Sequence, residues 1–407
     1  MRSVLAPVRE SVVVFDEVVA ARHRSEFARL LSDPGLRGRV DADVVGRRAS
    51  LVDEPGASST RVAVEVLVGL DGNRTLIARG EVLVSAASAE GIRLLTGSGF
   101  ARVGRVGSVL RFQNLGADAA VVRATCHELL WRGVRASPNY VVVAGGRIKA
   151  CLGLLEPLPT SGRPAVSATS DRWQATVEVA VLDTGGSTAA GHGTFVAGLV
   201  RQLAPNCRLD AQRVLASDGI GTDFSVAEAL HGLADNEQAP RVVNLSLGCT
   251  PVDGLVPVAM AAALDAMAVR HPQTVVVAAA GNDGSSRPSW PAAHPFVVAV
   301  GAVDGVGPAV FSNRGPWVDF SARADGVVST HVQGVRRSVA DDSSSSTSHA
   351  GPFAAWSGTS FAAAQVSGAF AAVIGNGLSR AEAIDELTRS GIPSHDCGIV
   401  VEPRSLT

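Results

Sequence analysis

Five short apolar runs in the second half of the chain constrain its fold more than any other feature. They read VEVAVLD, CRLDAQRVL, RVVNLSLG, TVVVAAAGN and FVVAVGAVD, and they follow one another between residues 177 and 304. Most are nearly continuous Val, Ala and Leu, which is typical of strands that are buried on both faces. Helical segments such as FSVAEALHGLAD and VPVAMAAALDAMAVR lie between them. Strands that alternate with helices predict an α/β fold, a doubly wound and mostly parallel sheet with right-handed crossovers.

The 407 residues allow two or three domains, and we divide them into four segments. Residues 174–407 form the α/β domain, and residues 76–150 read β-α-β-α-β, a small α+β domain of the split βαβ kind. The Pro-, Ser-, Gly- and Thr-rich residues 151–173 predict an exposed linker. Residues 1–75 are an extension of unknown function, with an amphipathic helix in FDEVVAARHRSEFARLL and two strands around LDGN.

Composition excludes several classes of partner. With 36 basic and 38 acidic residues the net charge is −2, so we expect neither nucleic acid nor an acidic membrane surface as a partner. The amino terminus has no uninterrupted apolar stretch of a signal peptide, and no run is long enough to span a bilayer. The five cysteines are odd in number, far apart and form no CxxC pattern, which favours reduced thiols. These features predict a cytoplasmic protein.

Asp183 and His192 lie where an α/β sheet usually carries its functional residues, just beyond the carboxyl end of a strand. Asp183 follows VAVL, and His192 opens a segment whose apolar residues recur at helical spacing from Val196. Taken alone, an Asp before Thr-Gly-Gly is more often a turn former, and a single His is more often structural. A dinucleotide site fits poorly, because the glycines after the strand do not form G-x-G-x-x-G.

Ser360 and Asn282 add a second pair of candidates. Ser360 stands at the start of a long helix of small residues, where the dipole and free N–H groups favour developing negative charge. A serine nucleophile needs a neighbouring base, and the base needs an orienting acid, which His192 and Asp183 could supply. Asn282 follows a buried strand, so its amide could stabilise an oxyanion together with the Ser360 backbone N–H. Alone, the serine would be a helix N-cap and the asparagine a turn residue.

The segments VAVLDTG, GHGTFVAG, AAAGN and SGTSFAA, in this order, resemble those of the subtilisin-like serine proteases. VVNLSLG, WPAAHPFVVAVGAVD and FSNRGPWVDFSA add to the resemblance, which covers about residues 177–374. It implies a serine endopeptidase that hydrolyses proteins or peptides through an acyl-enzyme, without a cofactor. In that reading Asp183 orients His192, His192 is general base and then acid, Ser360 attacks the carbonyl, and Asn282 donates to the oxyanion.

The resemblance also implies a substrate cleft. One edge would pair with the substrate backbone as an added strand, and two walls would enclose the side chain before the scissile bond. The edge is Gly219, Ile220 and Gly221, and the walls are Ser246, Leu247 and Gly248 on one side and Ala279, Ala280 and Gly281 on the other. Small wall residues permit a bulky apolar side chain there. Cys249 could lie near this pocket, although a buried small hydrophobe is the commoner role of such a cysteine.

GEVLVS and RASPNYVV resemble the first and last strands of the inhibitory prodomains of this family. The match implies that residues 76–150 act as an intramolecular prodomain and that the chain processes itself between Tyr140 and Trp173.

The sequence departs from the family pattern in four places. Phe195 replaces the second histidine of the H-G-T-H motif, and Ala364-Gln365 replaces Pro-His after the nucleophile. The short interval from Asp183 to His192 has no room for the usual strand and calcium loop, so no metal is expected there. DDSSSSTSHAG predicts a disordered insertion. A pseudoprotease that binds peptides without cutting them remains the rival reading.

Overall fold

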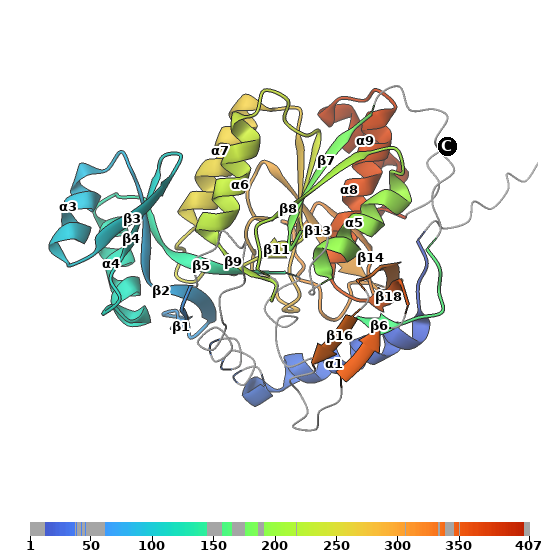
Figure 1. The fold of residues 1–407 in the computed structure, drawn as a ribbon, viewed down its shortest axis with the longest axis horizontal. Helices are drawn as coiled ribbons and strands as arrows, with labels where there is room; N and C mark the ends of the chain where they lie inside the picture. The colour runs from blue at the N-terminus through green and yellow to red at the C-terminus, as the bar shows by residue number, and fades with distance from the viewer. Residues whose placement is uncertain are drawn as a thin grey trace, which may run out of the picture.

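The computed structural model describes residues 13–36, 38, 42, 45, 62–144, 157–164, 176–185, 191–216, 218–305, 307–332, 334–337, 346–349 and 351–402. Figure 1 shows a central sheet with helices on both sides and a smaller unit beside it.

The central sheet has the strand order β19-β20-β14-β13-β12-β10-β7-β8, and all its neighbours are parallel except the β19–β20 pair. This order confirms the predicted α/β architecture. Its strands are β7 (Glu178–Asp183), β8 (Arg208–Arg213), β10 (Val242–Leu245), β12 (Val275–Ala279), β13 (Val297–Val303), β14 (Phe320–Arg323), β19 (Ile392–Ser394) and β20 (Gly398–Val400). Its helices are α5 (His192–Leu203), α6 (Asp223–Asp235), α7 (Val258–Arg270), α8 (Thr359–Gly375) and α9 (Arg380–Ser390).

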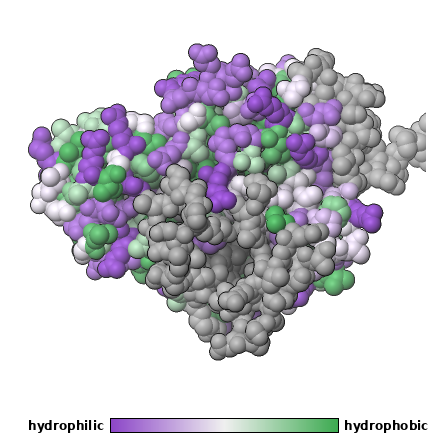
Figure 2. Space-filling model, viewed as in Figure 1, coloured by the Kyte–Doolittle hydropathy of each residue, from purple (hydrophilic) through white to green (hydrophobic). Residues whose placement is uncertain are grey.

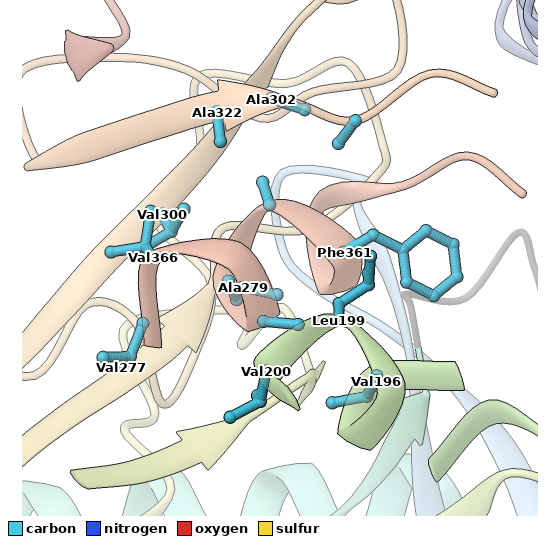
Figure 3. Packing of buried hydrophobic residues seen from close by; sticks show 14 of the residues in the cluster. Val196, Leu199, Val200, Val277, Ala279, Val300, Ala302, Ala322, Phe361 and Val366 are labelled. Atoms are coloured by element: carbon cyan, nitrogen blue, oxygen red, sulfur yellow. The ribbon is translucent and has the colours of Figure 1, made fainter. Parts of the chain in front are cut away.

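Both faces of this sheet are buried, as the continuous apolar runs predict. Val179 and Val181 of β7 face the core that contains α5 and α8, whereas Ala180 and Leu182 face the core that contains α6 and α7. In Figure 3 the side chains of α5 and α8 meet over β12 and β13. Among the described residues, no single helix is long and apolar enough to cross a membrane; only α8 and α9 together pass that test, with a bend of 118° between them.

The smaller unit has the element order ββαββαβ. Its elements are β1 (Val64–Val68), β2 (Arg74–Ser85), α3 (Ala89–Gly97), β3 (Ala101–Val106), β4 (Val109–Gln113), α4 (Ala119–Trp131) and β5 (Ala136–Ala144). Two expectations need correction. Strand β3 was not predicted, because it is an edge strand whose Arg and Gly residues are mostly exposed. The boundary between residues 75 and 76 cuts through β2, whose first residues pair with β1, so the unit starts at Val64.

The remaining elements lie at one end of the central sheet (Figure 1). They are α1 (Glu17–Ser32), β6 (Leu158–Pro159), β9 (Ile220–Thr222), β11 (Leu247–Gly248), β15 (Val327–Thr330), β16 (Gly334–Arg337), β17 (Ser346–His349) and β18 (Phe353–Trp356). The expected disorder of the serine-rich stretch is wrong for Ser346–His349. These four residues form β17 and pair with β16, because hairpin pairing satisfies backbone groups without an apolar sequence. The other serine-rich residues, 341–345, lie outside the described ones.

Candidate active site

Asp183 and His192 meet at the carboxyl end of β7. The Nδ1 atom of His192 lies 2.9 Å from both Oδ1 and Oδ2 of Asp183. The Thr184 backbone N–H donates to Oδ1 at 2.7 Å and holds the carboxylate in place. Both side chains are buried, with exposed fractions of 0% and 3%. An Nδ1–H that donates to the carboxylate leaves Nε2 of the neutral imidazole as an acceptor.

Gly191 makes this arrangement possible at the start of α5. It has φ = +65°, a left-handed conformation that favours glycine, and a Cβ there would lie 2.4 Å from the ring of His331. The imidazole of His192 packs edge-on against Trp356, with ring centroids 5.5 Å apart, and lies 5.6 Å from Phe361. Its Nε2 atom is buried and has no hydrogen-bond partner within the described part of the chain. The expected metal-free loop between Asp183 and His192 falls on residues 186–190, outside the described residues.

Ser360 is the second residue of α8 and is fully buried. Its Oγ donates to the Ser246 backbone carbonyl at 3.1 Å, and the Ser246 hydroxyl donates to the Ser360 carbonyl at 2.8 Å. The nucleophile candidate therefore turns toward the end of β10 and not toward His192.

Asn282 follows β12 and is also fully buried. Its Oδ1 accepts from the Thr359 backbone N–H at 2.8 Å and from the Thr359 hydroxyl at 3.0 Å. Because Oδ1 is used in this way, the Nδ2 donor is directed to the opposite side of the amide. The N–H groups in the first turn of α8 lack partners within that helix, so both predicted oxyanion donors lie at this helix terminus.

Sequence reasoning missed Asn313, which fixes the loop that carries Asn282. Its Nδ2 donates to the Ala280 carbonyl at 2.9 Å, and its Oδ1 accepts from the backbone N–H of Asp283 and of Ser285, each at 3.1 Å. Gly281 has φ = +104°, and a Cβ there would lie 2.5 Å from Asn313 Nδ2. Asn313 lies inside the FSNRGP segment, which was matched to the family without a role for this residue.

The predicted cleft edges are brought together by β5. This strand pairs antiparallel with β9 on one side and with β11 on the other, so it fills the space between them. Val142 lies opposite Gly221, and Val143 opposite both Ile220 and Gly248. The chain direction of β5 leads past Ala144, which lies opposite Leu247 and donates its N–H to the Gly219 carbonyl at 2.8 Å.

A cavity lies between β5 and the end of β12. Its lining includes the predicted wall residues Leu247, Gly248, Ala279 and Gly281. Ala280 does not line it; its carbonyl instead accepts from the Ser289 hydroxyl at 2.5 Å. Ser289, Asp283 and Thr250 also line it, and none of the three was predicted. Cys249 lines it as well, and burial raises the pKa of this thiol well above its ordinary value.

Polar groups of β5 also close the amino ends of α6 and α7. The Asn139 side-chain oxygen accepts from the Phe224 N–H at 3.1 Å, and the Ser137 hydroxyl accepts from the Val258 N–H at 3.3 Å. The Phe224 and Val258 N–H groups belong to the first turns of α6 and α7, where a helix leaves its N–H donors unpaired. Tyr140, fully buried, donates its hydroxyl to the Leu255 carbonyl at 2.8 Å.

Asp223 is a second buried carboxylate that the sequence did not single out. It accepts from the Met260 N–H at 2.7 Å and from the Ala259 N–H at 3.3 Å, which caps α7. Burial raises its pKa to about 7, and the two backbone donors oppose that shift.

An Asp-His pair, a serine at a helix amino terminus and a buried asparagine beside it, on a doubly wound sheet, define a serine-hydrolase type of site. The comparisons agree with this class. The sequence profile of the subtilase family matches residues 134–388, more than half of the chain. The chain therefore belongs to the subtilase family, the family of subtilisin-like serine proteases.

Individual relatives cover less of the chain. A thermophilic serine proteinase of Bacillus sp. (strain AK1) is 36% identical over 206 residues, which are 47% of this chain and 44% of that protein. Subtilisin BL of Lederbergia lenta is 34% identical over 186 residues, 38% of this chain and 66% of that one. The chain thus spans about half to two thirds of the length of these relatives. Fervidolysin of Fervidobacterium pennivorans shares the fold, with a TM-score of 0.57, 18% identity and coverage of 87% of this chain and 64% of its own.

Proposed function

We propose that this protein is a serine endopeptidase with Asp183, His192 and Ser360 as its catalytic triad. The observation that carries the proposal is the buried Asp183–His192 contact, with the His192 ring next to Phe361, the residue after Ser360. Among the described residues, Nε2 of His192 has no hydrogen-bond partner. Family membership supports it, as do the names of the relatives.

The reaction starts when the Ser360 hydroxyl leaves the Ser246 carbonyl and donates to Nε2 of His192. His192 takes the proton as Oγ attacks the scissile carbonyl, and the carboxylate of Asp183 stabilises the imidazolium. The tetrahedral oxyanion accepts hydrogen bonds from the Ser360 backbone N–H and from Nδ2 of Asn282. His192 then returns the proton to the leaving amine, and a water activated by His192 hydrolyses the acyl-enzyme. The predicted edge and wall residues bind the substrate chain.

We further propose that the small unit, residues 64–144, is the prodomain. Its last strand lies between β9 and β11 as a substrate chain would, with the carboxyl end of the strand leading toward Ser246 and Ser360. The same strand caps α6 and α7, so it would help these helices to form, as a folding chaperone does. Cleavage would follow Ala144, within the predicted interval from Tyr140 to Trp173. The cytoplasmic location stays a prediction, as does a pocket that permits a bulky apolar side chain before the scissile bond.

Ser360→Ala tests the nucleophile. We expect kcat on a mixed peptide library to fall about 10⁶-fold, the loss typical of removing a serine nucleophile in this family. Labelling by a fluorophosphonate probe should disappear, and mass spectrometry should show one uncut chain. Ser390→Ala, at the exposed end of α9, is the matched control and should behave as wild type.

Two results would contradict the assignment. Labelling that persists in Ser360→Ala would place the nucleophile elsewhere. A wild-type chain that neither labels nor cuts any peptide, but binds peptides, would be the pseudoprotease.

A further inference from the structure

Helix α1, in the extension of unknown function, packs against the loops that carry the candidate site. Nδ1 of His23 lies 3.0 Å from the hydroxyl of Ser357, three residues before Ser360. Phe27 stacks on Phe311 with ring centroids 4.4 Å apart. The side chain of Leu31 reaches Gly284, two residues after Asn282; a Cβ there would lie 2.9 Å from Leu31. One helix therefore contacts the nucleophile loop and the oxyanion loop together.

Charges and backbone contacts fix α1 in this place. Arg24 forms an ion pair with Asp325, which is fully buried and also accepts from Arg323 Nε at 3.0 Å. Arg323 Nη2 lies 2.6 Å from Glu17 at the start of the helix. The Asp16 N–H donates to the Gly326 carbonyl at 2.7 Å. A charge pair with one buried partner holds position better than an exposed pair does.

Apolar burial adds to this anchoring. Phe27 and Leu30 are fully buried in the same core as α5 and α8. Each such side chain contributes about 1.5–3 kcal/mol when it leaves water. An isolated helix of this length is marginal in water, so the surface beneath it stabilises α1.

The direction of β5 shows which half of the cleft α1 covers. β5 runs antiparallel to β9 and β11, and its carboxyl end leads to Ser246, whose carbonyl holds the Ser360 hydroxyl. A substrate would continue past Ser360, away from β11. β18 ends at Trp356, directly before Ser357, so this segment leads into Ser360, and α1 packs on β18. Figure 1 shows β5 pointing past β9 and β11 toward the end of the molecule where α1 and β18 lie.

The contacts of α1 that hold it are with the peptidase part of the chain. The Val328 N–H donates to the Val14 carbonyl at 2.9 Å, and the Thr160 hydroxyl donates to Asp16 at 2.7 Å. Thr160 follows β6, which pairs with β18 and lies on the carboxyl side of the proposed cleavage point. A cut between β5 and β6 leaves every one of these contacts intact.

We propose that α1 is a second inhibitory segment, which covers the part of the cleft that receives the residues after the scissile bond. It stays in place after the chain is cut behind β5, so this cut alone does not open the site. The inference rests on the proposed protease function. Full activity then requires α1 to leave, by proteolysis of the extension or by displacement.

The double variant Arg24→Ala/Phe27→Ala tests the role of α1 in the full chain. Arg323 still pairs with Asp325 in this variant, so no buried charge is left alone. The matched control is Arg22→Ala on the exposed face of the same helix, where Arg22 pairs with Glu26 one turn further along. Two rates are measured on each processed chain: hydrolysis of a quenched peptide with four residues on each side of the scissile bond, and labelling by a fluorophosphonate probe. The probe carries only fluoride as its leaving group, so it needs no space beyond Ser360.

We expect the double variant to hydrolyse the peptide at least fivefold faster than Arg22→Ala, while labelling changes less than twofold. Because β5 is unaltered in all chains, its competition with the peptide cancels in this ratio. If both rates fall together, α1 positions the two loops and the inhibitory role is wrong. Equal rates in all chains also overturn it.

Failure of the proposed function has a different signature, since no chain would then label at Ser360. In that case, hydrogen exchange at residues 353–361 tests whether α1 packs on the loop that precedes Ser360. Faster exchange in the double variant than in Arg22→Ala supports the contact of α1 with this loop, and identical exchange overturns it.

Discussion

The two halves of the candidate site are in different states. In the acid–base half, the carboxylate of Asp183 and the imidazole of His192 already lie 2.9 Å apart and are buried. In the nucleophile half, the Ser360 hydroxyl donates to the Ser246 carbonyl, and no residue that the structure describes bonds to Nε2 of His192. The first half is built by two adjoining elements, β7 and α5, whereas the second depends on three loops that meet at the start of α8.

The difference shows which contacts the fold supplies without a substrate. Backbone donation from Thr184 and the left-handed Gly191 set the Asp-His pair by local geometry. The Ser360 hydroxyl, in contrast, must leave the Ser246 carbonyl before it can donate to His192. Pre-organisation therefore resides in the acid–base half and in the oxyanion donors, and the nucleophile is the movable part.

The largest effect expected within the acid–base half comes from Asp183→Asn. The amide would present a donor to Nδ1, so the imidazole would keep its proton on Nε2 and lose its function as a base. We expect kcat to fall about 10⁴-fold, with little change in KM, measured with a peptide substrate. Asp235→Asn, which alters an exposed aspartate on α6, is the control. A loss below tenfold would show that the Asp183 contact is structural only.

In the nucleophile half, Asn282→Ala removes the side-chain donor to the oxyanion. The expected loss in kcat is about 10²–10³-fold. Thr359→Val separates the two functions of Asn282, because it removes a hydroxyl that donates to Oδ1 and accepts from the Gly281 N–H at 3.2 Å, and it leaves Nδ2 in place. Two lost hydrogen bonds of about 1 kcal/mol each correspond to a loss of roughly thirtyfold or less. Equal losses in the two variants would mean that Asn282 only holds the loop. Steady-state kinetics and thermal unfolding of both variants make the comparison.

The sequence was most informative where a residue's role follows from its own segment. Continuous Val and Ala runs predicted the strands, and the carboxyl end of β7 predicted the position of Asp183. It was least informative where distant segments meet. Asn313 acts through a loop 30 residues away, and Ser289 enters the cavity from beyond the Asn282 loop. The insertion of β5 between β9 and β11 depends on pairing across some 80–100 residues, which no local pattern encodes.

Asp223 is a buried aspartate outside both halves of the site, and it can be compared with Asp183. Asp183 has an imidazole partner, whereas the partners of Asp223 in the described part of the chain are backbone N–H donors, and burial raises its pKa to about 7. The folded chain therefore keeps a proton that the unfolded chain releases near the ordinary aspartate pKa of 3.8. The stability that this proton contributes is intact below pH 3.8 and is lost as the pH rises through about 7. At about 1.4 kcal/mol per unit, the loss amounts to a few kcal/mol.

Asp223→Asn removes that titration, so its free energy of unfolding should fall less between pH 4 and pH 8 than that of the wild type. Its kcat should stay within about twofold, because Asp223 does not contact the triad. Denaturant unfolding at both pH values measures the difference, in a Ser360→Ala background to prevent self-digestion. Asp385→Asn, which alters an exposed residue of α9, is the control and should keep the wild-type pH dependence. If Asp223→Asn also keeps it, Asp223 is ionised in the folded chain across this range.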